Sequence, residues 1–330
     1  MIQVWRRSTR SLQALLSVVC LLVGSTSFAA TPNMSEPKLR YIESNGIRMR
    51  IAEMGEGPLV ILVHGWPESW YSWRHQLPAL AAAGFRAVAP DMRGYGKSDK
   101  PQAVEDYDIH KVTGDIAGIV DALGEKNAML VGHDWGAIVT WHAMLLHPNK
   151  FTALVAMSVP YSGRGPQSIV QTLQRAMGDN FYYILYFQEP GVAEKEFDAD
   201  PRGILSRLYL SPDSPREAPV VKDPKRAAGG WIPRLGAPKA LPSWLSQADL
   251  DYYVKEFTEA GFRGGINYYR NFHRNWETTP QLSGHTATGS TTSTPPSRAS
   301  SLPSGTYGLP RTCRCGGGSA GSVRARSHCR

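Results

Sequence analysis

Residues 127–147 constrain the fold of this chain more than any other segment. A short apolar run, Ala128 to Val131, leads into Gly132-His133-Asp134-Trp135-Gly136, and a helix-like segment then continues to the residue before Pro148. Because a proline ring ends a helix, this pattern predicts a strand, a sharp turn and a helix. The two glycines permit a tight turn and close packing, which bulkier side chains would obstruct.

Asp134 is the candidate nucleophile of this turn. The segment has the pattern of the nucleophile elbow, Gly-x-Ser-x-Gly, with a carboxylate in place of the hydroxyl. A carboxylate in that place attacks a carbon electrophile and forms a covalent alkyl ester. An ordinary loop aspartate that caps the following helix is the alternative. The flanking glycines and the preceding apolar strand favour the nucleophile.

A second motif, His64-Gly65-Trp66-Pro67, follows the apolar run at 58–63. Together with the elbow downstream, it predicts an oxyanion hole made by the backbone N–H groups of Trp66 and Trp135. We interpret the side chains of His64 and His133 as structural rather than catalytic.

Strands and helices alternate along the first half of the chain. This order predicts an α/β fold with a mostly parallel sheet, whose strand carboxyl ends build the active site. The expected strands are two short ones within 38–56 around an Asn45-Gly46 turn, then 58–63, 85–90, 128–131 and 153–159, and the expected helices are roughly 70–83, 109–123 and 135–147. Residues 30–160 would therefore form the core.

Residues 161–282 are richer in Tyr, Phe and Trp than the preceding segment. We predict that they form a helical lid over the sheet. One helix is clear, because Ser246 and Asp249 form a capping box, an apolar face follows, and Gly261 ends it. A lid rich in aromatic residues suggests an apolar or aromatic substrate.

The two ends of the chain carry its positive charge. Residues 1–29 contain three arginines and no acid, and the Leu12–Val23 apolar run before Ser27-Phe28-Ala29 is typical of an export signal cleaved after Ala29. Residues 285–330 contain six arginines and no acid. Subtracting these nine charges from the net +8 leaves −1 for residues 30–284, so the body has no basic face for nucleic acid.

Residues 283–330 are composed mainly of Ser, Thr, Gly, Pro and Arg, which predicts a disordered tail. Arginine without lysine or acid is also what out-of-frame translation of a GC-rich gene produces. After signal cleavage we expect a periplasmic or secreted protein with no stable membrane insertion. No spacing of Cys and His suggests a metal site and no glycine loop suggests a phosphate-binding cofactor, so we expect neither. Oligomeric state is left open.

Taken together, these motifs resemble the epoxide hydrolases of the α/β-hydrolase fold. The resemblance covers roughly residues 38–282 and rests on His64–Pro67, on the Asp-Met-Arg-Gly-Tyr-Gly-Lys-Ser-Asp run at 91–99 and on Gly132–Gly136. Two lid segments, 183–191 and 261–271, resemble the tyrosine-bearing segments of that family. The resemblance implies that Asp134 opens an epoxide to a vicinal diol with water, while Tyr183 and Tyr269 bind the epoxide oxygen. Two phenols suit that role, because they donate hydrogen bonds to a developing alkoxide.

The chain departs from that family after residue 282. The resemblance implies further strands there, followed by an acid and a histidine that activate water, but no Asp or Glu follows Glu277, and the only later histidines are His285 and His328. The expectation is a sheet without its final strands and a chain that stalls as the ester after one turnover or is inactive.

Two other functions compete with epoxide hydrolysis. Haloalkane or haloacid dehalogenases also use an aspartate at this turn, with halide-binding donors such as the indoles of Trp66 or Trp135. The paired lid tyrosines favour the epoxide. The second alternative is a non-catalytic, truncated product that keeps the pocket without turnover.

Overall fold

The computed structural model describes residues 2–6 and 36–285, all of which belong to one compact unit, Met1–Thr294. Most of the predicted export signal at 1–29, and the predicted tail from 286 onward, lie outside the described residues. The α/β-hydrolase architecture expected from the sequence is present.

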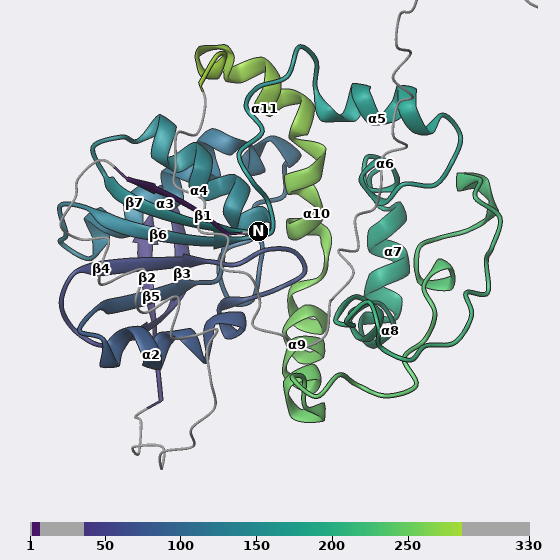
Figure 1. Cartoon of the computed structure of the whole chain (residues 1–330), viewed down its shortest axis with the longest axis horizontal. Helices are drawn as coiled ribbons and strands as arrows, with labels where there is room; N and C mark the ends of the chain where they lie inside the picture. Colours follow the sequence, from purple (N-terminus) through teal and green to yellow (C-terminus); the bar gives the residue numbers. More distant parts are fainter. Residues whose placement is uncertain (1, 7–35, 286–330) are drawn as a thin grey trace, which may run out of the picture. The chain divides into compact units, whose positions relative to one another are not determined.

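A seven-stranded sheet forms the core, in the order β1-β7-β6-β4-β5-β3-β2 (Figure 1). Its central four strands, β7, β6, β4 and β5, pair in parallel, and the outer pairings are antiparallel. The strands are β1 (Ile2–Arg6), β2 (Lys38–Ser44), β3 (Ile47–Met54), β4 (Leu59–Val63), β5 (Arg86–Pro90), β6 (Ala128–His133) and β7 (Phe151–Met157).

The β7 edge of the sheet is occupied by the N-terminal segment. β1 pairs with β7 in antiparallel register, from Ile2 opposite Met157 to Arg6 opposite Ala153. Within the described part of the chain, no strand follows β7. The backbone groups of β7 that face this edge therefore pair with a segment that the sequence assigns to an export signal.

Both faces of the central strands are buried, as their continuous apolar runs require. Alternate residues point to opposite faces, so Ile61 and Val63 of β4 join one apolar cluster while Val60 and Leu62 join another. The first cluster includes residues of α3 (Ile109–Ala122) and α4 (Trp135–Leu146), and the second those of α2 (Gln76–Ala82). Helices thus pack on both faces of the sheet.

The single helix predicted for 70–83 is wrong. The structure has a 3₁₀ turn, η1 (Trp70–Trp73), followed by a separate α2 that begins at Gln76. Pro78 explains the break, because inside a continuous helix its ring would clash with the Arg74 carbonyl four residues earlier. Restarting the helix at Gln76 places Pro78 in the first turn, where a proline is tolerated.

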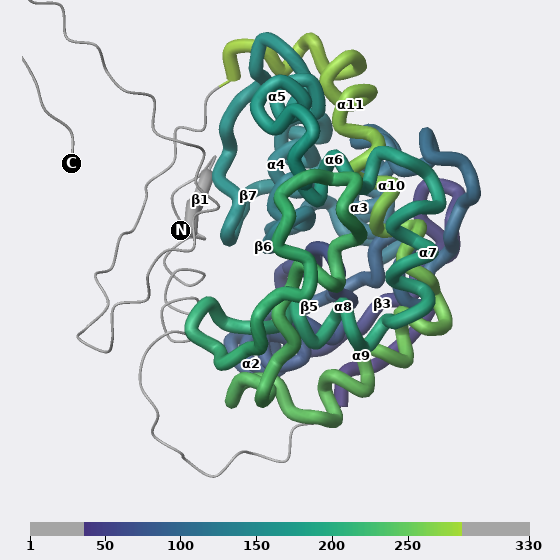
Figure 2. The backbone as a smooth tube through the Cα atoms, turned by 90° about the vertical axis from the view of Figure 1, so that its right-hand side faces the viewer, coloured from purple at the N-terminus to yellow at the C-terminus, as the bar shows by residue number. Residues whose placement is uncertain are grey.

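The lid consists of helices that cover the sheet in Figure 2. In Figure 1, α9, α10 and α11 lie next to the sheet and α5 to α8 lie beyond them. Their bounds are α5 (Ile169–Met177), α6 (Tyr183–Tyr186), α7 (Val192–Ala199), α8 (Pro201–Leu208), α9 (Gln247–Ala260), α10 (Arg263–Arg270) and α11 (Phe272–Thr278), with short 3₁₀ turns η3 (Arg226–Ala228), η4 (Ile232–Arg234) and η5 (Pro280–Leu282). A further 3₁₀ turn, η2 (Val104–Tyr107), belongs to the core and precedes α3. The Ser246–Asp249 capping box of α9 is confirmed, and Gly261 ends that helix with a φ of 72°. None of the described helices is long and apolar enough to cross a bilayer.

A buried ion pair stabilises the loop after β5. The Arg93 guanidinium donates two hydrogen bonds of 2.6 Å to the carboxylate of Asp115 on α3, and the two side chains are 3% and 0% exposed. This pair matters for the site because the Arg93 carbonyl accepts a hydrogen bond of 3.0 Å from Tyr268 of the lid helix α10.

Replacing Asp115 with alanine is expected to lower the free energy of unfolding by about 3–5 kcal/mol, because Arg93 would remain buried without a counter-charge. The matched control is Asp121→Ala on the same helix, where an exposed carboxylate pairs with Lys150 and the expected cost is about 0–1 kcal/mol. Urea denaturation measures both costs, as a shift of the midpoint while the dependence of the unfolding free energy on urea concentration stays unchanged. Equal costs for the two variants would contradict the prediction.

Candidate active site

The turn between β6 and α4 presents Asp134 in a strained conformation. Asp134 has φ 53° and ψ −120°, in a region that residues with a side chain rarely adopt. Glycine is required beside it, because a Cβ on Gly136 would lie 1.9 Å from the Val63 carbonyl oxygen and one on Gly132 would lie 2.3 Å from the Gly136 carbonyl oxygen. The turn therefore brings Asp134 against the end of β4.

The loop after β4 contacts the Asp134 carboxylate directly. The Trp66 N–H donates a hydrogen bond of 3.0 Å to Asp134 Oδ1. Burial raises the pKa of Asp134, and the nearby negative charge of Glu68 raises it further, whereas the N–H groups of Trp66 and Trp135 oppose that rise. One of the two predicted oxyanion-hole donors, the Trp66 N–H, thus already binds and orients the carboxylate.

The His64 ring links the loop after β4 to the loop after β5. Its Nδ1 lies 2.8 Å from the Gly65 carbonyl oxygen, and its Nε2 accepts a hydrogen bond of 3.1 Å from the Met92 N–H. Burial lowers the pKa of His64, which keeps the ring neutral and both nitrogens engaged. The carbonyl of Pro67, at the end of the motif, accepts a hydrogen bond from Tyr209 of the lid.

Tyr183 of α6 and Tyr269 of α10 come together although they are far apart in the sequence. Their ring centroids lie 5.8 Å apart, and the centroid of the Tyr269 ring lies 5.1 Å from that of Trp135, the residue after Asp134. Burial raises the pKa of the Tyr269 phenol well above 10, with a further contribution from the charge of Asp134. The nearby Trp135 indole opposes that rise. Tyr269 therefore stays protonated, and its own O–H can donate to a substrate.

Two glycines allow α10 to approach the core closely enough to place Tyr269. A Cβ on Gly264 would lie 2.3 Å from the carbonyl oxygen of Gly94 in the loop after β5. A Cβ on Gly265 would lie 2.7 Å from Cδ1 of the Trp66 ring. The Gly-Gly pair in the lid segment 261–271 is thus a packing requirement.

The helices that carry the tyrosines are bonded to each other by residues whose roles the sequence did not reveal. Gln188 Nε2 donates to the carbonyls of both Ile184, at 2.8 Å, and Tyr269, at 3.2 Å. Arg270 Nε donates to the Phe187 carbonyl at 2.8 Å. These bonds fix the spacing between α6 and α10, and so between the two phenols.

Aromatic side chains enclose the space around the tyrosines. Trp231, which precedes η4 and which the sequence did not single out, stacks on Tyr183 with centroids 5.0 Å apart and on Trp66 with centroids 5.9 Å apart. The ring centroids of Phe187 and Tyr269 lie 4.9 Å apart. The space around the two tyrosines is therefore lined mainly by aromatic rings.

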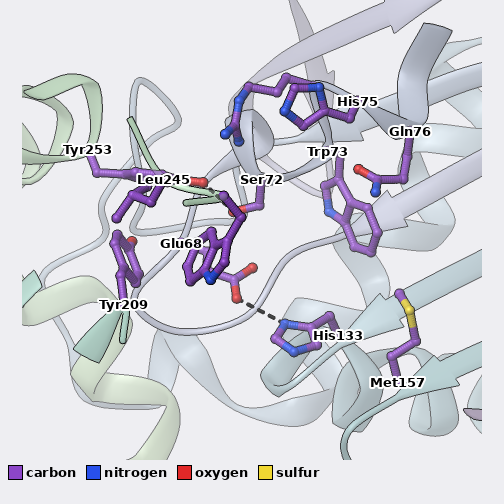
Figure 3. Close-up of a pocket in the computed structure, with 12 residues that line it drawn as sticks. Glu68, Ser72, Trp73, His75, Gln76, His133, Met157, Tyr209, Leu245 and Tyr253 are labelled. Atoms are coloured by element: carbon purple, nitrogen blue, oxygen red, sulfur yellow. Dashed lines mark hydrogen bonds and ion pairs between the residues drawn. The ribbon is translucent and has the colours of Figure 1, made fainter. Parts of the chain in front are cut away.

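Glu68 is a further charged residue at the site, and the sequence did not indicate it. Its Oε1 lies 2.9 Å from Nδ1 of His133, and its Oε2 accepts a hydrogen bond of 3.2 Å from the Gly65 N–H. Figure 3 shows this pair on the wall of a cavity of about 380 Å³, which His75, Tyr209 and Tyr253 also line. The only sequence signal for Glu68 is its place directly after the His64–Pro67 motif. Its partner, His133, lies 65 positions further along the chain.

The predicted site residues thus gather around one carboxylate, from the ends of β4 and β6 and from two lid helices. Across residues 36–285, no group of three or more His, Cys, Asp or Glu side chains is arranged to bind a metal ion.

Comparison with known proteins agrees with this geometry. Residues 58–263 match the family model described as the alpha/beta hydrolase fold. The chain is 49% identical to Epoxide hydrolase A of Mycobacterium tuberculosis over 257 residues, which cover 77% of this chain and 80% of that protein. It is 42% identical to Epoxide hydrolase 2 of Siraitia grosvenorii over 74% of this chain and 75% of that protein.

A solved structure gives the same result. The crystal structure of Epoxide Hydrolase A from Mycobacterium thermoresistibile superposes with a TM-score of 0.68 at 45% identity, and covers 76% of this chain and 79% of that one. With its elbow aspartate, its amide donors and its paired lid tyrosines, the chain belongs to the epoxide hydrolases of the α/β-hydrolase fold.

Proposed function

We propose that this protein opens epoxides through a covalent ester on Asp134. The carboxylate attacks a ring carbon, the C–O bond of the ring breaks, and the epoxide oxygen leaves as an alkoxide still attached to the neighbouring carbon. The observation that carries the proposal is the placement of Asp134, at φ 53° and bonded to the Trp66 amide, beside a pair of phenols whose rings lie 5.8 Å apart.

Tyr183 and Tyr269 act on the epoxide oxygen in this proposal. Both phenols donate hydrogen bonds as negative charge develops there, and one of them transfers its proton to the alkoxide. The Trp135 indole, which opposes the rise in the pKa of Tyr269, stabilises the phenolate that results. The stacked rings of Trp66, Trp231 and Tyr183 favour an apolar or aromatic substituent on the epoxide.

The mass of the intact protein after incubation with styrene oxide tests this function. The expected adduct has the mass of one styrene oxide and maps to the peptide that contains Asp134. An adduct on another residue, or none, would exclude the proposed nucleophile.

A dehalogenase is less well supported, because two phenols above the carboxylate suit a developing alkoxide better than a halide. The donor that a halide could use is the Trp66 indole, whose Nε1 is buried without a hydrogen-bond partner in the described structure. Release of halide from a chloroalkane, compared with ring opening of styrene oxide under the same conditions, separates the two functions.

The rate of ester formation is expected to depend on pH through Asp134. Only the carboxylate form attacks, and burial raises the pKa of Asp134 above its usual value, which is about 3.9. The rate should therefore fall as the pH is lowered through a midpoint above that of an ordinary aspartate. Rapid-quench measurement of adduct formation against pH gives the midpoint, and one at or below about 3.9 would contradict the prediction.

We also propose that residues 1–29 direct export with cleavage after Ala29, as the pattern of basic and apolar residues suggests. N-terminal sequencing of protein from the periplasm or medium tests this, with Ala30 as the expected first residue. Retention of Met1 in an exported protein, or a protein confined to the cytoplasm, would contradict it.

A further inference from the structure

One carboxylate of the lid, that of Glu196 on α7, accepts three hydrogen bonds from uncharged donors. The N–H of Trp231 donates to Oε2 at 2.8 Å, and the N–H of Ile232 donates to Oε1 at 2.9 Å. The Tyr186 phenol also donates to Oε2, at 2.8 Å. Burial raises the pKa of Tyr186 and the bond to Glu196 raises it further, so the phenol remains a donor. Glu196 therefore fixes the backbone that carries the Trp231 ring.

Two glycines let the backbone before Trp231 approach this carboxylate closely. A Cβ on Gly230 would lie 2.2 Å from Glu196 Oε1, so a side chain there would push the loop away from the carboxylate. Gly229 has a φ of 143°, in a region that favours glycine. The Gly-Gly pair is thus a requirement for the hydrogen bonds to Glu196.

The helix that carries Glu196 is bonded to the helix that carries Tyr269. Arg270 of α10 donates a hydrogen bond of 2.9 Å from Nη2 to Glu194 Oε2 of α7. The two side chains are 5% and 11% exposed, so solvent screens this ion pair little. Glu196 therefore has a fixed place relative to α10.

The Trp231 ring in turn determines how Tyr183 lies. The two rings are 15° from parallel with centroids 5.0 Å apart, and Trp231 also stacks on Trp66, at 7° and 5.9 Å. Tyr183 begins α6, a single turn of four residues without a side-chain cap, so the backbone alone gives the phenol little support. The stacked contact, with the edge contact to Tyr269 at 80°, sets the plane of the ring and the direction of its O–H. Because the Trp66 N–H binds Asp134, Trp231 also links this phenol to the loop that orients the nucleophile.

We propose that Glu196 is a positioning residue for ring opening, and that it acts through the Trp231 ring on the Tyr183 phenol. This inference rests on the proposed function, because it concerns how one of the two phenols is directed at the epoxide oxygen. Neither Glu196 nor Trp231 supplies a reacting atom. A misplacement of a catalytic group by about 1 Å can cost about 100-fold in rate. Loss of either residue therefore slows ester formation although Asp134 is intact.

Single-turnover rates of ester formation test this role, measured with saturating styrene oxide by rapid quench and intact mass. In Glu196→Gln the side-chain NH₂ group is itself a donor, so the amide cannot accept all three hydrogen bonds. We expect ester formation to be roughly 10- to 100-fold slower. Gly230→Ala should give a similar loss by a different route, because its Cβ displaces the same backbone from the carboxylate. Trp231→Leu, which removes the stacked ring, should be at least as slow.

The same substitution in a chain without the Tyr183 phenol separates positioning from a general structural role. Because Glu196 acts on Tyr183, adding Glu196→Gln to Tyr183→Phe should slow ester formation by less than about threefold. Adding it to Tyr269→Phe should slow the reaction by the full 10- to 100-fold or more, roughly as in the otherwise unchanged chain. A residue that only stabilises the fold would cause the same loss in both backgrounds.

Glu189→Gln is the matched control, because Glu189 is an exposed acid between α6 and α7. It should leave the rate unchanged. Tyr186→Phe should change the rate by no more than a few-fold, because both backbone N–H groups stay bonded to Glu196. One adduct on each chain after long incubation, in every variant, shows that the site is folded.

Two results would overturn the inference while wild type still forms the ester and so supports the proposed function. One is an unchanged rate in both Glu196→Gln and Gly230→Ala. The other is a loss from Glu196→Gln that is equally large with and without the Tyr183 phenol. No ester in wild type would instead refute the proposed function, and the inference with it.

Discussion

Replacing Asp134 with asparagine is expected to lower the rate of ester formation roughly 10⁴- to 10⁶-fold, as the loss of a sole nucleophile does in other covalent enzymes. The amide is isosteric and can still accept the Trp66 N–H hydrogen bond, so the turn should keep its geometry. It lacks the negative charge that attacks the ring carbon. Intact mass after incubation with styrene oxide should show no adduct over a period in which wild type is fully modified.

Asp251→Asn is the control for that experiment. Asp251 is an exposed carboxylate on α9, paired with Arg202 on the lid surface. Its replacement should leave adduct formation unchanged. If Asp134→Asn acquired an adduct at the wild-type rate, the reagent would be reacting elsewhere and Asp134 would not be the nucleophile.

Local patterns predicted the parts of the site that lie within a few residues of each other. The elbow at 132–136 and the loop at 64–67 were visible because a tight turn needs glycine and an oxyanion donor must follow a strand. The meeting of those two loops followed from parallel strands, whose carboxyl ends share one edge. The structure places the Trp66 N–H 3.0 Å from Asp134 Oδ1 accordingly.

Contacts between distant segments were not predictable in this way. Glu68 reaches His133 only because the loop after β4 folds back toward the end of β6, and nothing in the run Pro67-Glu68-Ser69 indicates that partner. Trp231 lies between helices, so no periodic pattern marks it, yet it stacks on both Tyr183 and Trp66. Its position depends on the path of the whole lid.

The helix predicted across 70–83 failed for a more local reason. Its apolar spacing suits one helix, but Pro78 cannot lie in the interior of that helix, and the structure starts a new one at Gln76. Pro78, rather than the apolar spacing, thus decides where the helix is interrupted. The pairing of β1 with β7, by contrast, joins segments at opposite ends of the core and carries no signal in the sequence.

Removing both lid phenols is expected to have the second-largest effect on ester formation. In Tyr183→Phe and Tyr269→Phe, one donor to the epoxide oxygen remains, and each variant should form the ester about 10²- to 10³-fold more slowly, the usual cost of one such donor. The double variant should be slower than either, by less than the product of the two, because both phenols act as a unit on the same oxygen and losing one already weakens the contribution of the other.

The neighbouring tyrosines on the same two helices provide matched controls. Tyr186 of α6 donates to Glu196 at 2.8 Å, and Tyr268 of α10 donates to the Arg93 carbonyl at 3.0 Å, so both phenols are committed to the protein. Tyr186→Phe and Tyr268→Phe should each cost about 1 kcal/mol of folding stability and leave ester formation within a few-fold of wild type. A double variant, Tyr183→Phe with Tyr269→Phe, that is no slower than these controls would show that ring opening needs no phenol, because charge on the epoxide oxygen must then be stabilised by other donors.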